Sequence, residues 1–107
     1  MTEYEAGQLV LDRMVNDWGL QVLRLELAQL YRRRVRAALD WPQSGPVYVT
    51  ADDTRRVMGR LGMTLSNNNK LGATFRTKEW EYAGFDVHSE THGSHGNRLR
   101  AWRLRAA

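Results

Sequence analysis

The arginines near the end of the chain are the residues whose types and spacing most clearly indicate a chemistry, the binding of an anion. Residues 91–107 contain four arginines, Arg98, Arg100, Arg103 and Arg105, and no carboxylate. The whole chain has 16 basic and 12 acidic residues, a net charge of +4 and a pI near 10.0. Residues 1–45 hold six of each sign, so the excess lies entirely in the second half. A localised positive field attracts polyanions, and double-stranded DNA is the partner we expect first.

Side chains that can contact bases or phosphates surround this positive charge. Asparagine can pair with adenine and arginine with guanine in the major groove, and basic or amide side chains on a loop can bind phosphate. The candidate DNA-binding residues form two sets. The first, on an expected helix, is Asn67, Asn68, Asn69, Lys70, Thr74, Arg76 and Lys78, and the second, on an expected loop and strand, is His92, His95, Asn97, Arg98 and Arg100.

Each set also has a purely structural interpretation. Three consecutive asparagines are more typical of a loop and a helix cap than of base recognition. The arginines after residue 97 could form a solvated strand face, although four arginines without a nearby acid in the sequence favour contact with nucleic acid. A further arginine cluster at residues 32–36 would spread round a helix, so we expect it to be solvated.

The sequence offers no constellation typical of catalysis. It lacks cysteine, a P-loop, a nucleophile elbow and a dinucleotide-binding glycine motif. Asp52 and Asp53 are adjacent carboxylates, but directly after Thr50 they fit a helix start, where the helix dipole favours negative charge. We therefore expect neither enzyme activity nor a cofactor.

The histidines invite comparison with a metal site. Four side chains of metal-binding type fall within eight residues: His88, Glu90, His92 and His95. A loop rich in turn-forming residues does not fix the tetrahedral geometry that zinc requires. We expect no metal, and we expect the loop histidines to lie near phosphate, so that binding tightens as the pH falls through about 6.5.

Helical spacing predicts two helices in the first part of the chain. Thr2 with Glu5 three residues later is a capping-box signature, and Gly19 is a plausible stop for the first helix. A second helix is expected from about Leu20 to Leu39. Two prolines and a glycine within residues 41–46 then end helical structure. Residues 1–41 are thus predicted to be a helical scaffold or dimerisation segment.

The second part of the chain predicts strand, helix, turn, helix and hairpin in that order. After a short β-prone run at 47–49, Thr50 and Asp53 indicate the start of a helix that ends at Gly62. The next helix is expected from residue 67 or 68 to about 82, ending at Gly84. Strands are expected at 85–90 and 98–104, around a loop at 91–97.

The apolar residues of the last expected strand change face near Ala101. Leu99 and Ala101 would share one face of a regular strand, and Trp102 and Leu104 the other. Either a bulge near Ala101 shifts the alternation, or Trp102 packs against the N-terminal helices. With these elements the fold class is α+β, in which N-terminal helices precede a winged helix-turn-helix, residues 47–105, with a C-terminal β-hairpin wing.

Several segments resemble a known group of proteins. They are Val49-Thr50-Ala51-Asp52-Asp53, Asn69-Lys70-Leu71-Gly72-Ala73-Thr74-Phe75-Arg76, Gly84 and, after a loop rich in His and Ser, Leu99-Arg100-Ala101-Trp102-Arg103. This pattern is similar to small phage and prophage proteins of mostly unassigned role that end in a winged-helix-like domain, and it covers roughly residues 20–104. The resemblance implies that fold and a phage-like or accessory-gene setting, and little about mechanism.

Two functions fit these patterns. The first is a DNA-binding winged-helix protein, such as a small transcriptional regulator or phage accessory factor, with helix 67–80 in the major groove and the wing, 91–100, on the backbone. The alternative is a protein-interaction or assembly module without nucleic acid. Leu-rich stripes in the N-terminal helices (Leu20, Leu23, Leu25, Leu27 and Leu30) make a homodimer plausible. The lack of a secretion signal or long apolar run predicts a cytoplasmic protein without a membrane partner.

Overall fold

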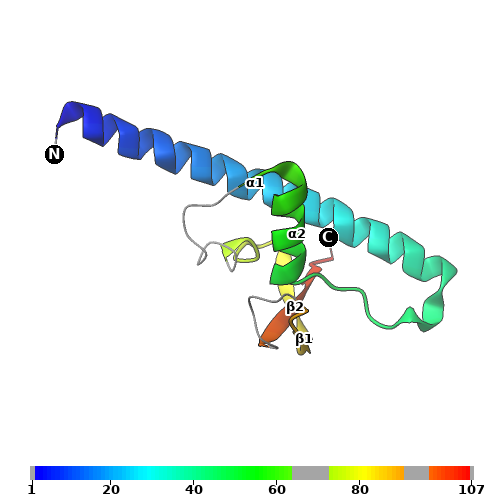
Figure 1. Ribbon diagram of the computed structural model, residues 1–107. Coiled ribbons are helices and arrows are strands. Elements are labelled where there is room, and N and C mark those ends of the chain that lie inside the picture. The colour runs from blue at the N-terminus through cyan, green and yellow to red at the C-terminus, as the bar shows by residue number, and fades with distance from the viewer. Residues whose placement is uncertain (1, 64–72, 91–96, 107) are drawn as a thin grey trace.

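The computed structural model describes residues 2–63, 73–90 and 97–106, and within them all side chains except those of residues 8–17. In these parts the elements are α1 (Glu3–Asp40), the 3-10 helix η1 (Pro42–Ser44), α2 (Ala51–Leu61), β1 (Trp80–His88) and β2 (Arg98–Leu104). The two strands form one antiparallel hairpin. Figure 1 shows the long helix α1 crossing over α2 and the hairpin. The α+β class expected from the sequence is confirmed.

Helix α1 is a single helix of 38 residues, so the prediction of two helices divided at Gly19 is wrong. Its start is as expected, because the Thr2 side chain accepts a hydrogen bond from the Glu5 backbone N–H at 3.2 Å. Glycine inside a helix costs only about 1 kcal/mol relative to alanine. The helix-forming residues on both sides of Gly19, and the burial of Leu23 and Leu27 further along, outweigh that cost.

Helix α1 ends where the proline-rich segment predicts. Its last residue is Asp40, and the backbone N–H of Trp41 bonds to the carbonyl of Ala38. Pro42 then opens η1, and Gly45 follows it with φ of 89°, a conformation that favours glycine. The break separates α1 from the rest of the chain, and α1 then packs back against α2 and β2.

Helix α2 has the capping box that the sequence predicts. The Thr50 side chain accepts a hydrogen bond from the backbone N–H of Asp53. The Asp53 side chain in turn accepts one from the backbone N–H of Thr50, at 2.9 Å. At the other end Gly62 adopts a left-handed conformation, φ 66°, and its N–H bonds back to the carbonyls of Met58 and Gly59. Both boundaries are therefore confirmed.

The prediction of a helix from about 67 to 82 is wrong over its described part. Residues 67–72 lie outside the described residues, Ala73 is helical, residues 74–79 form turns, and β1 begins at Trp80. Trp80 pairs with Leu104 in the hairpin and buries its ring in the core. Gly84, expected to end that helix, instead lies inside β1 with φ of 94°. The expected strand 85–90 is present, but it starts five residues earlier and ends at His88.

A bulge in the hairpin resolves the change of face near Ala101. Tyr82 pairs with Trp102 and Asp86 with Arg100, so three residues of β1 lie opposite Ala101 alone. The irregularity is thus in β1, at Gly84, and β2 has the predicted bounds. Trp102 also packs against the core cluster that includes α1, so both explanations hold in part.

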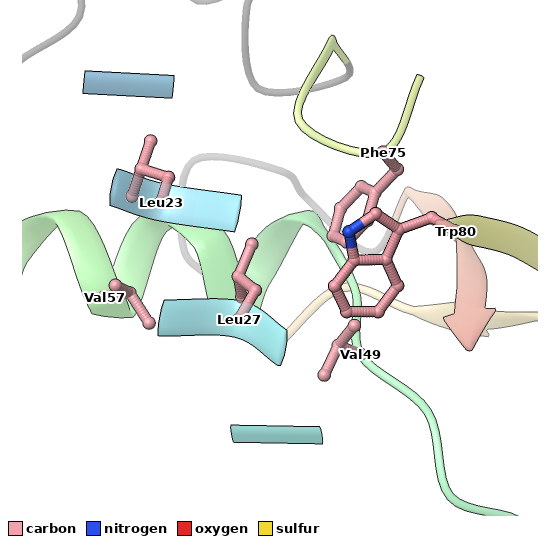
Figure 2. Packing of buried hydrophobic residues seen from close by; sticks show 6 residues of the cluster. All are labelled: Leu23, Leu27, Val49, Val57, Phe75 and Trp80. Carbon is pink, nitrogen blue, oxygen red and sulfur yellow. The ribbon is translucent and has the colours of Figure 1, made fainter. Parts of the chain in front are cut away.

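The core lies where α1, α2 and the hairpin meet (Figure 2). Its buried members are Leu23, Leu27, Val49, Val57, Phe75 and Trp80. Val49 is held at the edge of β2 by two backbone hydrogen bonds with Trp102, of 2.9 and 2.8 Å. The Phe75 ring stacks on Trp102 with centroids 5.4 Å apart. Among the described residues, no helix combines the length and apolar character needed to cross a membrane.

Candidate nucleic-acid interface

Of the first set of candidate DNA-binding residues, those on the expected helix, only some are exposed among the described residues. Arg76 and Lys78 are exposed in the turns before β1, as expected. Thr74 is fully buried, so its expected place on an exposed flank is wrong. The remaining members, Asn67–Lys70, lie outside the described residues. The two exposed cations therefore carry this part of the candidate interface.

Hydrogen bonds from Arg24 of α1 hold the segment at Thr74 against α1. Its Nη2 donates to the carbonyl of Ala73 at 2.9 Å, and its Nε donates to the carbonyl of Thr74 at 3.2 Å. A guanidinium presents several donors in a fixed plane, which suits two neighbouring carbonyls. This contact joins residues some fifty positions apart, and no local sequence signal marks it.

Strand β2 begins with two arginines that are exposed to solvent. Arg98 and Arg100 are exposed and two positions apart on β2, so they share one face of the strand. They lie opposite His88 and Asp86 in β1. The Arg100 guanidinium also sits over the Tyr82 ring, 5.3 Å from its centroid. Within the described residues Arg98 forms no salt bridge, and neither does Arg100.

Tyr82 and Asp86 flank the bulge of β1 and are joined by a side-chain hydrogen bond. The Tyr82 hydroxyl donates to Asp86 Oδ1 at 2.8 Å. This hydrogen bond raises the pKa of Tyr82 above its ordinary value of 10.0, helped by desolvation and by the negative charge of Asp86, while Arg100 opposes the shift. The hydrogen bond from the neutral Tyr82 hydroxyl to Asp86 thus fixes the position of the ring that Arg100 contacts.

The Asp86→Asn variant is expected to lower the pKa of Tyr82 toward 10.0, because it removes the charge-assisted hydrogen bond and the negative charge. In the parent chain the contact is fully present below the ordinary phenol pKa and is lost as the pH rises through the raised one. A site-specific ¹³C label on the Tyr82 ring carbon would report the titration by NMR. An unchanged midpoint in the variant would show that Asp86 does not set this pKa.

The other two arginines near the end of the chain, Arg103 and Arg105, are paired, which the sequence does not indicate. Arg103 Nε donates to Glu81 Oε1 at 2.8 Å, and Arg105 Nε lies 3.7 Å from Glu81 Oε2. The expectation of an arginine run without a local acid therefore fails at this end, because antiparallel pairing brings Glu81 opposite Arg103. Of the four arginines from Arg98 to Arg105, Arg98 and Arg100 are therefore the two without a salt bridge among the described residues.

The expected loop contacts lie mostly outside the described residues, which include neither His92 nor His95. Asn97 is exposed, and its carbonyl accepts a hydrogen bond from the Ser89 N–H at 2.8 Å. His88 is exposed at the end of β1. Within the described ranges no three His, Asp or Glu side chains gather in a geometry that could hold a metal ion.

The two adjacent carboxylates of α2 have structural partners. Asp53 accepts two hydrogen bonds from the Arg34 guanidinium, at 2.8 and 2.9 Å, and this bonding raises the pKa of Arg34. Asp52 accepts from the Ser89 hydroxyl and the Glu90 N–H, both at 2.9 Å. The structural interpretation of the pair is confirmed. Arg34, expected to be solvated, instead joins α1 to α2.

A cleft of about 710 Å³ lies beside this pair, between the end of α1, η1, the start of α2 and the end of β1. Trp41, Tyr48 and Val87 give it apolar surface, and Arg56 and Glu90 at its edge are joined by a 3.3 Å salt bridge. Its charged lining is thus engaged in bonds within the protein. The exposed arginines of β2 and of the preceding turns remain the better candidate for binding an anion.

Comparison with protein-family models, with curated proteins and with solved structures finds no match for this chain.

Proposed function

We propose that this chain is a DNA-binding protein of winged-helix type, a small regulatory or accessory factor of the kind found in phages and prophages. The observation that carries the proposal is a set of exposed cations on two segments at opposite ends of the hairpin, Arg76 and Lys78 before β1 and Arg98 and Arg100 on β2. Among the described residues none of the four forms a salt bridge. They are therefore available to phosphate without breaking an existing ion pair.

The order of elements supports the winged-helix assignment. Helix α2 is followed by a turn at Gly62, by the segment that ends at Lys78, and by an antiparallel hairpin. Val49 adds a bridge to the edge of β2, as a short first strand would. In this proposal the segment before β1 enters the major groove, and the hairpin lies on the adjacent backbone.

The separation of the two cationic segments suits a duplex. The turns before β1 lie near Leu104, at the end of β2, and Arg98 is six residues away at the start of that strand. At 3.3 Å per residue, this separation is about 20 Å. One turn of duplex DNA advances about 34 Å, so the two segments are roughly half a turn apart. That spacing would let one segment contact a groove while the other contacts the next stretch of backbone.

A pair of double variants tests this proposal. Replacing Arg98 and Arg100 with glutamine should weaken binding to a labelled duplex about tenfold or more at low salt and reduce the slope of log K against log salt by about 2, because two phosphate contacts are lost. Fluorescence anisotropy at several salt concentrations measures both. The matched control replaces Arg103 at the end of β2 and Arg105 just after it with glutamine, which removes the same charge but from residues already paired with Glu81.

The two variants make the outcome specific to position. Equal losses in both would indicate a response to net charge alone and would remove the wing from the proposed interface. If the parent chain does not bind duplex even at low salt, the DNA proposal is wrong. Binding that salt hardly affects would also contradict it, because release of counterions from phosphate is strongly salt-dependent.

The alternative function, a protein-interaction or assembly module, has its own supporting observation. Large apolar side chains are exposed on α1, among them Trp18, Leu25 and Leu39. Contiguous exposed apolar surface is typical of a protein-binding site. The two functions are compatible, since a DNA-binding protein that acts as a dimer needs both kinds of surface.

A further inference from the structure

The outward face of α1 carries a regular row of large apolar side chains. Tyr4, Trp18, Leu25 and Leu39 are each between 65% and 80% exposed, and they are separated by multiples of seven residues. Val35, four residues before Leu39, is also exposed. We call these five residues the outer stripe. The same seven-residue spacing in the sequence also includes Leu11, between Tyr4 and Trp18, and Arg32, between Leu25 and Leu39.

Apart from Val35 at its edge, the outer stripe lies on the side of α1 opposite the face that the helix buries in its own domain. Leu25 is two positions from both Leu23 and Leu27, which are fully buried. Two positions along an α-helix rotate the side chain by about 200°. The domain therefore cannot cover the outer stripe and the core face together. The leucines expected from the sequence to form a dimer surface divide accordingly: Leu20, Leu23 and Leu27 are buried within the monomer, Leu30 is partly buried against the core, and Leu25 faces outward.

Two helices pack along their length through a seam that uses two positions of every seven residues. The outer stripe supplies the first position at Tyr4, Trp18, Leu25 and Leu39, and the second at Val35. Fully burying one large apolar side chain contributes about 1.5–3 kcal/mol, so covering several of them along one seam can hold two helices together. Helix α1 offers the necessary length, since 38 residues extend over roughly 57 Å. Its N-terminal turns project beyond the rest of the molecule (Figure 1).

The charges of α1 indicate both the partner and its direction. Residues 3–19 contain four carboxylates and one arginine, whereas residues 20–40 contain five arginines and two carboxylates. Arg32, Arg33 and Arg36 are exposed and, among the described residues, form no salt bridges. A second α1 running in the opposite direction would place acidic half against basic half, and a parallel one would place like charges together.

We infer that a second copy of this chain packs antiparallel along the outer stripe of α1. The arrangement has a twofold axis, so each copy uses the same surface. This inference deepens the proposed function, because a dimer would present two basic faces to DNA, but the contact itself requires no DNA. A monomer that still binds DNA would overturn the dimer alone, and a dimer without DNA affinity would overturn the DNA proposal alone.

Sedimentation equilibrium of the full chain, without DNA, tests the association. From low to high micromolar concentration the parent should reach twice its chain mass of 12.4 kDa. The double variant Trp18→Glu, Leu25→Glu should remain at the mass of one chain, with its helical circular dichroism retained. The control Leu61→Glu introduces one glutamate at an exposed leucine of α2 and should still form dimers. A monomeric parent, or an unchanged dimer of the double variant, would refute the inference, as would a monomeric parent that binds lipid vesicles instead.

The chain has no cysteine, so engineered cysteines report the direction unambiguously. Glu3→Cys and Asp40→Cys place one thiol at either end of the outer stripe. Under mild oxidation, a mixture of the two variants should form the mixed disulfide dimer, and each variant alone should form little. Rapid crosslinking of Glu3→Cys to itself would show a parallel pair and would refute the antiparallel arrangement.

Discussion

Replacing Asp53 with alanine is expected to lower the free energy of unfolding by about 3 kcal/mol. The Asp53 side chain is 5% exposed and holds the Arg34 guanidinium through two hydrogen bonds, while it also completes the capping box of α2. Its loss leaves Arg34 without its carboxylate and the Thr50 N–H without its acceptor. Because Arg34 is partly exposed, water can replace some of the lost interaction, and the cost falls at the low end for a broken buried pair.

Urea denaturation of the variant, followed by circular dichroism, measures this loss. The control is Glu90→Ala, which also removes a carboxylate paired with an arginine but one that is 81% exposed. Exposed pairs contribute between nothing and about 1 kcal/mol. Equal losses of stability in the two variants would mean that neither the burial of Asp53 nor its capping box adds to the stability that an exposed ion pair provides.

Features that depend on neighbouring residues could be predicted from the sequence. The cap at Thr2, the end of α1 before Pro42 and the capping box of Thr50 and Asp53 each need only three or four consecutive positions. The bounds of β2 followed in the same way, because the turn-forming loop before it and the β-prone residues within it are local signals. For such features the physical cause is contained in the segment itself.

Features that depend on distant contacts could not be predicted. The sequence predicts helix ends at Gly19 and Gly84, yet α1 continues through Gly19 and Gly84 lies at a bulge in β1. At residues 80–82, Trp80, Glu81 and Tyr82 satisfy a helical pattern as well as an alternating one. Pairing with β2 decides between the two, and that pairing is a property of the folded hairpin.

The candidate site shows the same division. The type and abundance of its arginines were evident from the sequence, but their partners were not. Arg34 pairs with Asp53, Arg24 binds the carbonyl at Thr74, and Arg103 pairs with Glu81 across the hairpin. The sequence places Glu81 in an expected helix, so the expected hairpin gives no indication of its pairing with Arg103. The contacts made by α1 had no local indication either.

Replacing Trp80 with alanine is expected to lower the free energy of unfolding by about 4 kcal/mol, the largest single effect we anticipate. The Trp80 ring is 3% exposed and makes edge contacts with Tyr31 of α1 and with Phe75, at centroid distances of 6.1 and 5.3 Å. It therefore joins the long helix to the hairpin. A chain of this length has a total stability of only about 5–15 kcal/mol, so the variant should be partly unfolded at moderate temperature.

Tyr82→Ala is the matched control, because it removes an aromatic ring from the same strand two positions away. Tyr82 is 42% exposed and contacts Trp102 at 6.2 Å, so its loss should cost only about 1 kcal/mol. Thermal denaturation of both variants at equal concentration compares the two costs. Trp80 is the first residue of β1 and is buried through its pairing with β2, so similar losses would mean that residues 80–82 do not pair with β2. The segment carrying Arg76 and Lys78 would then have a different geometry from the one on which the proposed interface depends.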